Sequence, residues 1–344
     1  MGASPEEIAK RYLDGNGSLR EVLGIQCDVE LRAIPLAQGE HNANFTFADS
    51  ETGRKFVLRI NFESQLGLAD QVAYEARALE ILVPSARTPR VLFLDSSKER
   101  IDHGVLVIEF FEGRHLDFHV PGDIEEAARI LADIHSVRPH DDCGLIRPSD
   151  PLRSQYETCI GFFERYCASP YAEKRVEARV HRFIEQCVDA LKTPLDSTDA
   201  GHIQNTEAVP SHFLISDEGP GHMVDWEKPI VGEVAQDVAY FMSPTTTIWD
   251  TDYLFDPPAR RRFLEAYWRA VDDRFPKGRF EERYPAFVMV NALLGITWSC
   301  NAIVDYRDPE KVLKNQKTAD LLGIYVSDGF LDRVERDCFE RRGC

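Results

Sequence analysis

The chain lacks paired cysteines and long apolar runs. Its eight cysteines are scattered, and none belongs to a Cys-x-x-Cys pair. This spacing is typical of reduced cytosolic thiols and argues against a disulfide framework or a zinc site. No stretch approaches the roughly eighteen apolar residues of a membrane span, and the N-terminal residues MGASPEEIAKRYL lack the apolar core of a signal peptide. We therefore expect a cytoplasmic protein without a membrane partner.

Positive charge is also in short supply. The 344 residues carry a formal net charge of −18. Nucleic-acid binding is therefore not expected, because phosphate contacts need a basic surface. An acidic protein favours cationic small-molecule ligands, although the same charge is typical of an ordinary soluble surface. The hydrophobic content of 43% is enough for a large core or for two lobes.

Residues 202–229 contain the pattern around which the chemistry is organised. A polar loop leads into the apolar run Phe213–Ile215, a turn rich in Gly, Pro and Asp follows at 216–221, and a second strand is predicted over 224–227. Apolar runs on both sides of such a turn predict a β-hairpin.

Acidic side chains and a histidine lie at both ends of this hairpin. Glu207 precedes it, His212 is at its entry, and Asp225 and Glu227 are at its exit. Positions two apart in a strand point the same way, so Asp225 and Glu227 are expected to share a face. Oxygen ligands in this arrangement suit a hard divalent cation that also contacts phosphates.

This layout resembles the catalytic and metal-binding loops of the aminoglycoside phosphotransferase and choline kinase family, small-molecule relatives of protein kinases. The family pattern is His-x-Asp, four residues, Asn, a short hairpin and then Asp. On this resemblance Asn205 takes the His position, Glu207 the catalytic Asp position, His212 the position of the metal-binding Asn, and Asp225 that of the metal-binding Asp. Three of the four positions depart from the pattern. Histidine is a poorer ligand than an amide oxygen for Mg²⁺ and a better one for Mn²⁺ or Zn²⁺.

The resemblance implies an α+β, protein-kinase-like fold with two lobes. Residues 1–112 would form an N-terminal lobe with a leading helix and a small antiparallel β-sheet. Residues 113–344 would form a mostly helical C-terminal lobe that carries the catalytic and metal loops. Within the first lobe we expect a helix over 4–24, a strand over 29–36 and a strand over 55–61.

The same resemblance assigns the nucleotide-binding residues. The turn from Gly39 to Asn44 would cover the ATP phosphates. Arg59 would pair with them, and Glu75, on a helix that begins near residue 70, would orient Arg59. The segment from Glu109 to Phe111, which includes Phe110, would be the hinge that meets adenine.

In the second lobe, helices are expected over 125–137, 152–166, 173–191, 261–275 and 286–304. His135 is read as a core or supporting histidine, and Asp237 as an acid that braces the catalytic loop. Pro244–Asp250, with three adjacent threonines and a Trp, is either part of an acceptor pocket or a loop with helix-capping hydroxyls.

Two functions remain open at this point. The first is an ATP-dependent phosphotransferase that acts on a hydroxyl of a small molecule, with Glu207 as catalytic residue and Asp225, His212 and Glu227 holding Mg²⁺ or Mn²⁺. The second is a catalytically impaired, pseudokinase-like module that binds a nucleotide. A third idea, a zinc hydrolase built from His202, His212 and His222, has no HExxH-like spacing to support it. The oligomeric state is not predicted.

Overall fold

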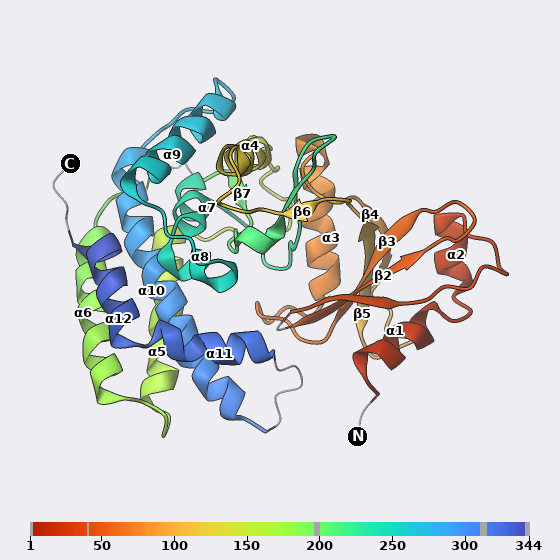
Figure 1. The fold of residues 1–344 in the computed structure, drawn as a ribbon, viewed down its shortest axis with the longest axis horizontal. Coiled ribbons are helices and arrows are strands. Elements are labelled where there is room, and N and C mark those ends of the chain that lie inside the picture. Colours follow the sequence, from red (N-terminus) through yellow and green to blue (C-terminus); the bar gives the residue numbers. More distant parts are fainter. Residues whose placement is uncertain (1–2, 40, 196–199, 310–314, 341–344) are drawn as a thin grey trace.

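The computed structural model describes residues 3–39, 41–195, 200–309 and 315–340. A β-sheet with two short helices lies at one side of the molecule, and most of the helices lie at the other (Figure 1). One helix, α3, lies between the two parts. This is the α+β arrangement predicted from the sequence, with an antiparallel sheet followed by a mostly helical region.

The main sheet has five strands in the order β1-β2-β3-β5-β4, and every neighbouring pair is antiparallel. The strands are β1 (Ile34–Gln38), β2 (Asn42–Ala48), β3 (Lys55–Asn61), β4 (Val91–Asp95) and β5 (Gly104–Glu109). The strand predicted over 29–36 was placed too early, because Val29 and Leu31 are buried against the first helices outside the sheet.

The predicted helix over 4–24 is two helices, α1 (Pro5–Leu13) and α2 (Gly17–Leu23). Gly15 takes a left-handed conformation at φ 62°. Asn16 then begins a new helix, because its side chain accepts a hydrogen bond from the Leu19 N–H at 3.1 Å. Ser4 caps α1, with reciprocal hydrogen bonds between Ser4 and Glu7.

The sheet is buried on both faces. Along β5, Val105 and Val107 belong to the apolar cluster that contains α1 and α2. Leu106 and Ile108 belong to the larger cluster that contains α3 (Gln71–Leu82). Since neighbouring residues of a strand point to opposite faces, α3 covers the face opposite α1 and α2. The core of the helical region therefore continues up to the sheet through α3.

The remaining elements follow in chain order, with two small sheets among the helices. They are η1 (Val83–Ser85), β6 (Arg114–His115), α4 (Asp123–His135), α5 (Pro151–Cys167), α6 (Lys174–Ala190), β7 (His202–Gln204), η2 (Pro210–His212), β8 (Phe213–Ile215), β9 (His222–Met223), β10 (Ile230–Gly232), α7 (Val234–Phe241), α8 (Pro244–Asp250), α9 (Pro257–Val271), α10 (Phe280–Arg307), α11 (Gln316–Tyr325), α12 (Asp328–Val334) and η3 (Glu335–Phe339).

The predicted hairpin exists but is shorter than expected. β8 pairs with β9 through Phe213 opposite Met223 and Leu214 opposite His222, and β9 ends at Met223. Residues 224–227 are therefore not a strand. Asp225 instead has a left-handed backbone with φ 65°. The prediction that Asp225 and Glu227 share one face of a strand was therefore wrong.

The helix α10 is long and apolar enough, by length and composition, to cross a membrane, and 56% of its most apolar window is buried inside the protein. A buried core helix passes the same test, so one such helix is weak evidence for a span. Polar residues such as Asn291 and Thr297 interrupt the sequence of α10, so it contains no unbroken apolar run. Both of these side chains are buried.

Candidate active site

One buried carboxylate, that of Asp237, holds the backbone of the loop after β7. Asp237, on α7, accepts hydrogen bonds from the backbone N–H groups of Asn205 at 2.7 Å and Thr206 at 2.9 Å. His135 lies 3.4 Å from the same carboxylate through Nε2, and its Nδ1 lies 2.8 Å from the Tyr267 hydroxyl. The predicted bracing acid and the supporting histidine of α4 thus meet under the loop. Thr206 itself has a left-handed backbone, with φ 69°.

Asn205 links the loop after β7 to the loop after β9. Its side-chain N–H donates to the backbone carbonyl of Asp225 at 2.8 Å, and its Oδ1 accepts the Glu207 N–H at 3.0 Å. The side chain is 1% exposed. Asn205 stands where the family pattern has a histidine, and its side chain holds the backbone at Glu207 and at Asp225 together.

Asp225 is held between two nitrogen groups. Its Oδ1 lies 2.5 Å from Nη2 of Arg59, and its Oδ2 lies 3.3 Å from Nε2 of His212. Burial raises the pKa of Asp225, but Arg59 and His212 lower it more, so this pKa is well below its usual value. Asp225 is therefore an anion at neutral pH.

Arg59 connects the sheet, α3 and the loop after β9. Besides Asp225 it contacts Glu75 through Nη1, and its Nε donates to Asn44 Oδ1 at 3.0 Å. The side chain is 4% exposed. Burial disfavours its charge, yet the Asp225, Glu75 and Glu227 carboxylates raise the pKa of Arg59 above its usual value. Arg59, Glu75 and Asn44, which the sequence had assigned to one site, lie together.

The imidazole of His212 is mostly buried. Burial lowers its pKa, but Asp225 and, to a lesser extent, Glu207 and Asp250 raise it above the usual value. A protonated ring donates from Nε2 to Asp225. Its Nδ1 is buried and has no hydrogen-bond partner among the described residues.

Glu227 lies near Asp225 without sharing a strand with it. Its carboxylate accepts a hydrogen bond from the side chain of Asn42 on β2, and its backbone carbonyl accepts one from Gln71 on α3. Burial, followed by the charges of Asp225 and Glu207, raises the pKa of Glu227 well above its usual value. Glu227 and Asp225 are close together, as expected. Their proximity results from the backbone turn at Asp225 and not from a shared strand face.

Glu207, the predicted catalytic residue, pairs with a lysine that sequence reasoning missed. Lys228 Nζ lies 2.5 Å from Glu207 Oε1, and the two side chains are 16% and 26% exposed. Lys228 directly follows Glu227 in the sequence. This position beside the predicted metal-binding acids was the signal that could have identified Lys228 as a site residue.

The predicted hinge residues Glu109, Phe110 and Phe111 each contact a different side chain. Glu109 is engaged by Arg90, which donates to Glu109 Oε1 from Nε at 2.7 Å. The Phe111 ring stacks on His222 with centroids 3.6 Å apart, and Lys55 lies 5.2 Å from the centre of the Phe110 ring. Gly39 donates its N–H to the Asn42 carbonyl at 2.9 Å and closes the β1–β2 turn.

The acidic side chains and histidines of the site do not form a closed metal centre by themselves. No group of three or more His, Cys, Asp or Glu side chains within the described ranges is arranged around a common metal position. The zinc alternative also has no support, because His202 bonds to the His135 carbonyl and His222 stacks on Phe111. The neighbouring carboxylates of Asp225 and Glu227 still fit a Mg²⁺ or Mn²⁺ ion whose remaining ligands are phosphate oxygens and water.

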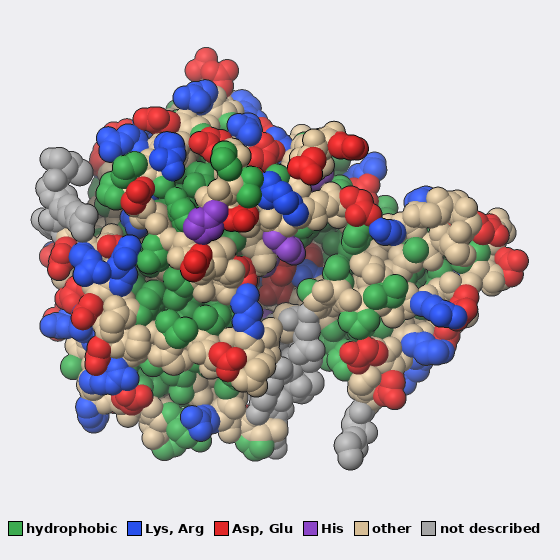
Figure 2. All heavy atoms as spheres, in the orientation of Figure 1, with side chains coloured by type: hydrophobic (Ala, Val, Ile, Leu, Met, Phe, Trp, Pro, Cys, Tyr) green, Lys and Arg blue, Asp and Glu red, His purple; other side chains and the backbone are tan. Residues whose placement is uncertain are grey.

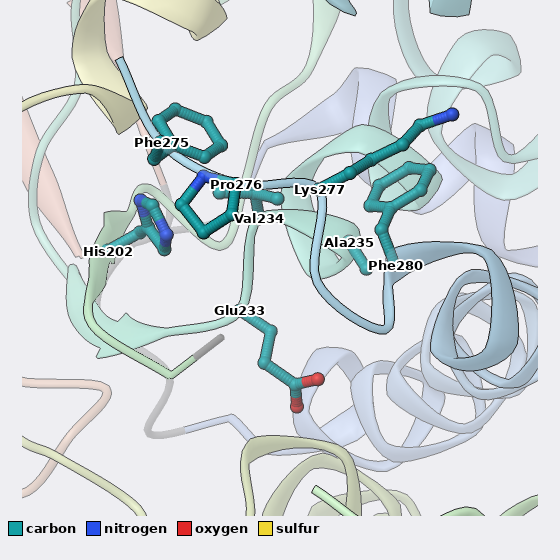
Figure 3. Close-up of a pocket in the computed structure, with 8 residues that line it drawn as sticks. All are labelled: His202, Glu233, Val234, Ala235, Phe275, Pro276, Lys277 and Phe280. Carbon is teal, nitrogen blue, oxygen red and sulfur yellow. The ribbon is translucent and has the colours of Figure 1, made fainter. Parts of the chain in front are cut away.

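A hollow separates the sheet part from the helical part, and acidic and basic side chains are visible on its walls (Figure 2). Among the described residues, two cavities lie away from this hollow. One, of about 10 Å³, is next to His202, Glu233 and Phe275 and has room for about one water molecule (Figure 3). The other, of about 520 Å³, lies between α3 and residues 137–143.

Solved structures of small-molecule kinases share this fold. A spectinomycin phosphotransferase in complex with ADP and spectinomycin matches with a TM-score of 0.62, over 93% of this chain and 97% of its own, at 10% identity. The ethanolamine kinase of Plasmodium vivax matches with a TM-score of 0.60, over 90% and 86%, at 13% identity. A macrolide 2′-phosphotransferase of Brachybacterium faecium gives 0.58, over 92% and 99%, at 14% identity. The fold is therefore protein-kinase-like.

The family follows from the sequence itself. The model of the phosphotransferase enzyme family matches residues 32–281, which is most of the chain, and the chain belongs to that family. A comparison with curated proteins gives no match.

Proposed function

We propose that this protein is an ATP-dependent phosphotransferase that transfers the γ-phosphoryl group to a hydroxyl of a small molecule. One observation carries the proposal: Asn205 fixes the loop of Glu207 to that of Asp225, and Asp225 in turn pairs with Arg59. A candidate base, a candidate metal ligand and a candidate phosphate-binding cation therefore belong to one connected network.

Each group has a role that its environment supports. Arg59, oriented by Glu75 and Asn44, would bind the α- and β-phosphates. Mg²⁺ or Mn²⁺ held by Asp225 and Glu227 would neutralise the β- and γ-phosphates. Glu207 would accept the proton of the acceptor hydroxyl. Gly39 and residues 109–111 are proposed to contact the nucleotide, with the lobe boundary after residue 112.

The catalytically impaired nucleotide-binding module remains a second candidate, because both carboxylate oxygens of Asp225 are engaged by side chains. A metal ion would have to replace at least one of these contacts. The imidazole at position 212, in place of an amide, supports this alternative as well.

Incubation with ATP and either Mg²⁺ or Mn²⁺, against a panel of amino alcohols, sugars and aminoglycosides, tests the proposal. Transfer of the γ-phosphoryl group to one acceptor is expected. It should fall at least about 100-fold in Glu207→Gln and in Asp225→Asn. Glu218→Gln, in the exposed turn of the β8–β9 hairpin, is the control and should keep full activity. Tight ATP binding without transfer to any acceptor would support the binding module instead.

A further inference from the structure

Lys228 is a partly buried cation of the site to which the proposed roles assign no function. Its ammonium contacts Glu207 at 2.5 Å, and its side chain is only 16% exposed. The surrounding backbone is fixed, because the Lys228 carbonyl accepts a hydrogen bond from the Thr206 hydroxyl at 3.0 Å and the neighbouring Glu227 carbonyl accepts one from Gln71. The lysine is therefore held against the catalytic loop at both its backbone and its side chain.

An ordinary surface ion pair does not describe this contact. Lys174, which pairs with Glu177, exposes 91% of its side chain to water. The side chain of Lys228 is mostly shielded from water and pairs with Glu207, which belongs with Glu75, Asp225 and Glu227 to one acidic cluster that also contains Arg59. Arg59 is committed to Glu75 and Asp225, so Lys228 supplies the fixed positive charge at the Glu207 end.

The geometry points to a position next to the transferring phosphoryl group. A base that takes the proton of the acceptor hydroxyl lies within about 3 Å of that oxygen, and the oxygen in turn lies about 3–3.5 Å from the phosphorus it attacks. A cation in contact with Glu207 is therefore within reach of the γ-phosphate oxygens. In phosphoryl transfer these oxygens carry the charge that the protein must stabilise.

We propose that Lys228 binds the γ-phosphate of ATP and bridges it to Glu207, an inference that rests on the proposed phosphotransferase function. In the reaction a bond forms between the acceptor oxygen and the γ-phosphorus, and the bond between that phosphorus and the β–γ bridging oxygen breaks. The hydroxyl proton passes to Glu207 and then to solvent, and ADP leaves with the electron pair of the broken bond. Lys228 stabilises the charge on the γ-phosphate oxygens.

The first test measures binding, so it does not depend on an acceptor. ATP and ADP affinities are determined by calorimetry in EDTA for the wild type, Lys228→Met, Lys228→Arg and the exposed control Lys174→Met. ADP affinity should be the same in all four proteins. Lys228→Met should lose about 10-fold of the preference for ATP over ADP, equivalent to about 1.4 kcal/mol, and Lys228→Arg should keep it.

The second test uses the acceptor found in the panel. Lys228→Met should lower kcat about 100- to 1,000-fold, the effect of removing one transition-state charge donor, and Lys228→Arg should restore part of it. Equal ATP-to-ADP ratios in wild type and folded Lys228→Met would overturn the inference and leave Lys228 as a positioning residue for Glu207. If the wild type binds ATP but transfers nothing, the proposed function fails, while the binding ratio still decides the contact of Lys228.

Discussion

Arg59 and Asp225, 166 residues apart in the sequence, are joined by a contact of 2.5 Å between Nη2 and Oδ1. The first residue lies on the central strand of the sheet, and the second lies in the loop after β9. The contact therefore fixes the sheet to the helical part at the site itself. It also aligns the two residues that would bind the nucleotide phosphates and the metal.

Replacement of Arg59 by Met should destabilise the fold as well as weaken nucleotide binding. The variant leaves the buried Glu75 and the partly exposed Asp225 without their cation, and breaking a buried ion pair from one side costs about 3–5 kcal/mol. Urea unfolding of Arg59→Met and Arg59→Lys measures this cost, which should be smaller for lysine. Unchanged unfolding midpoints in both variants would show that the contact is not maintained in solution.

Asp237→Asn should loosen the catalytic loop. The carboxylate accepts from two backbone N–H groups, and an amide offers one oxygen and one N–H₂ group in their place. One buried donor then loses its acceptor, at a cost of about 1–3 kcal/mol. Hydrogen exchange of the Asn205 and Thr206 amides should become faster in the variant, whereas exchange in α6 should not change. Equal protection of both amides in the two proteins would contradict the bracing role.

The pair of Arg283 and Glu233 should show strong coupling in a double-mutant cycle. Arg283 is 1% exposed, contacts Glu233 at 2.8 Å through Nε and 2.5 Å through Nη2, and also binds Asp150 at 2.9 Å. Arg283→Met or Glu233→Leu alone leaves a buried charge and should cost about 3–5 kcal/mol. The double variant should cost less than the sum of the two, measured by chemical denaturation. Additive costs would contradict this prediction.

His202 should make the protein sensitive to acid. Burial, opposed by the hydrogen bond to the His135 carbonyl, lowers the pKa of His202 to about 3. Below pH 6.5 the unfolded chain binds a proton that the folded chain excludes, so stability falls as the pH drops toward 3, by up to about 1.4 kcal/mol per pH unit. Above pH 7 the residue has little effect.

Unfolding free energies at pH 7.5 and 5.5 measure this effect. The wild type should lose about 1 kcal/mol more over this interval than His202→Asn, since asparagine can still donate to the His135 carbonyl but does not take up a proton. His140→Asn, an exposed position, serves as control and should follow the wild type. A parallel decline in His202→Asn would assign the acid sensitivity to other groups.

Much of the site was predictable because it depends on local sequence patterns. The strand of Arg59 and the helix of Glu75 were predicted from their sequence patterns, and the resemblance to the phosphotransferase family assigned the roles of Arg59, Glu75 and Asp237. The turn at Asp225 was not predictable in the same way. The left-handed backbone at Asp225 is accompanied by contacts with Asn205 and Arg59, and the local sequence does not reveal these contacts.

Lys228 and the break at Gly15 show two further limits. The ion pair between Lys228 and Glu207 depends on how two loops 21 positions apart fold back on each other, which periodicity does not encode. The break depends on Asn16 as a cap, and an asparagine inside a helical pattern does not by itself distinguish a cap from an exposed helical position. The lobe boundary after residue 112 stays a prediction.

The position of α10 also affects the order in which the protein can be assembled during translation. This helix contacts α5, α6 and α7, all of which precede it in the chain, while α11 follows it. When residues 280–307 leave the ribosome, the apolar surfaces of α5, α6 and α7 that pack against them have already been synthesised. A nascent chain that stops before residue 280 would leave those surfaces without their central helix, and we expect it to bind chaperones rather than complete folding.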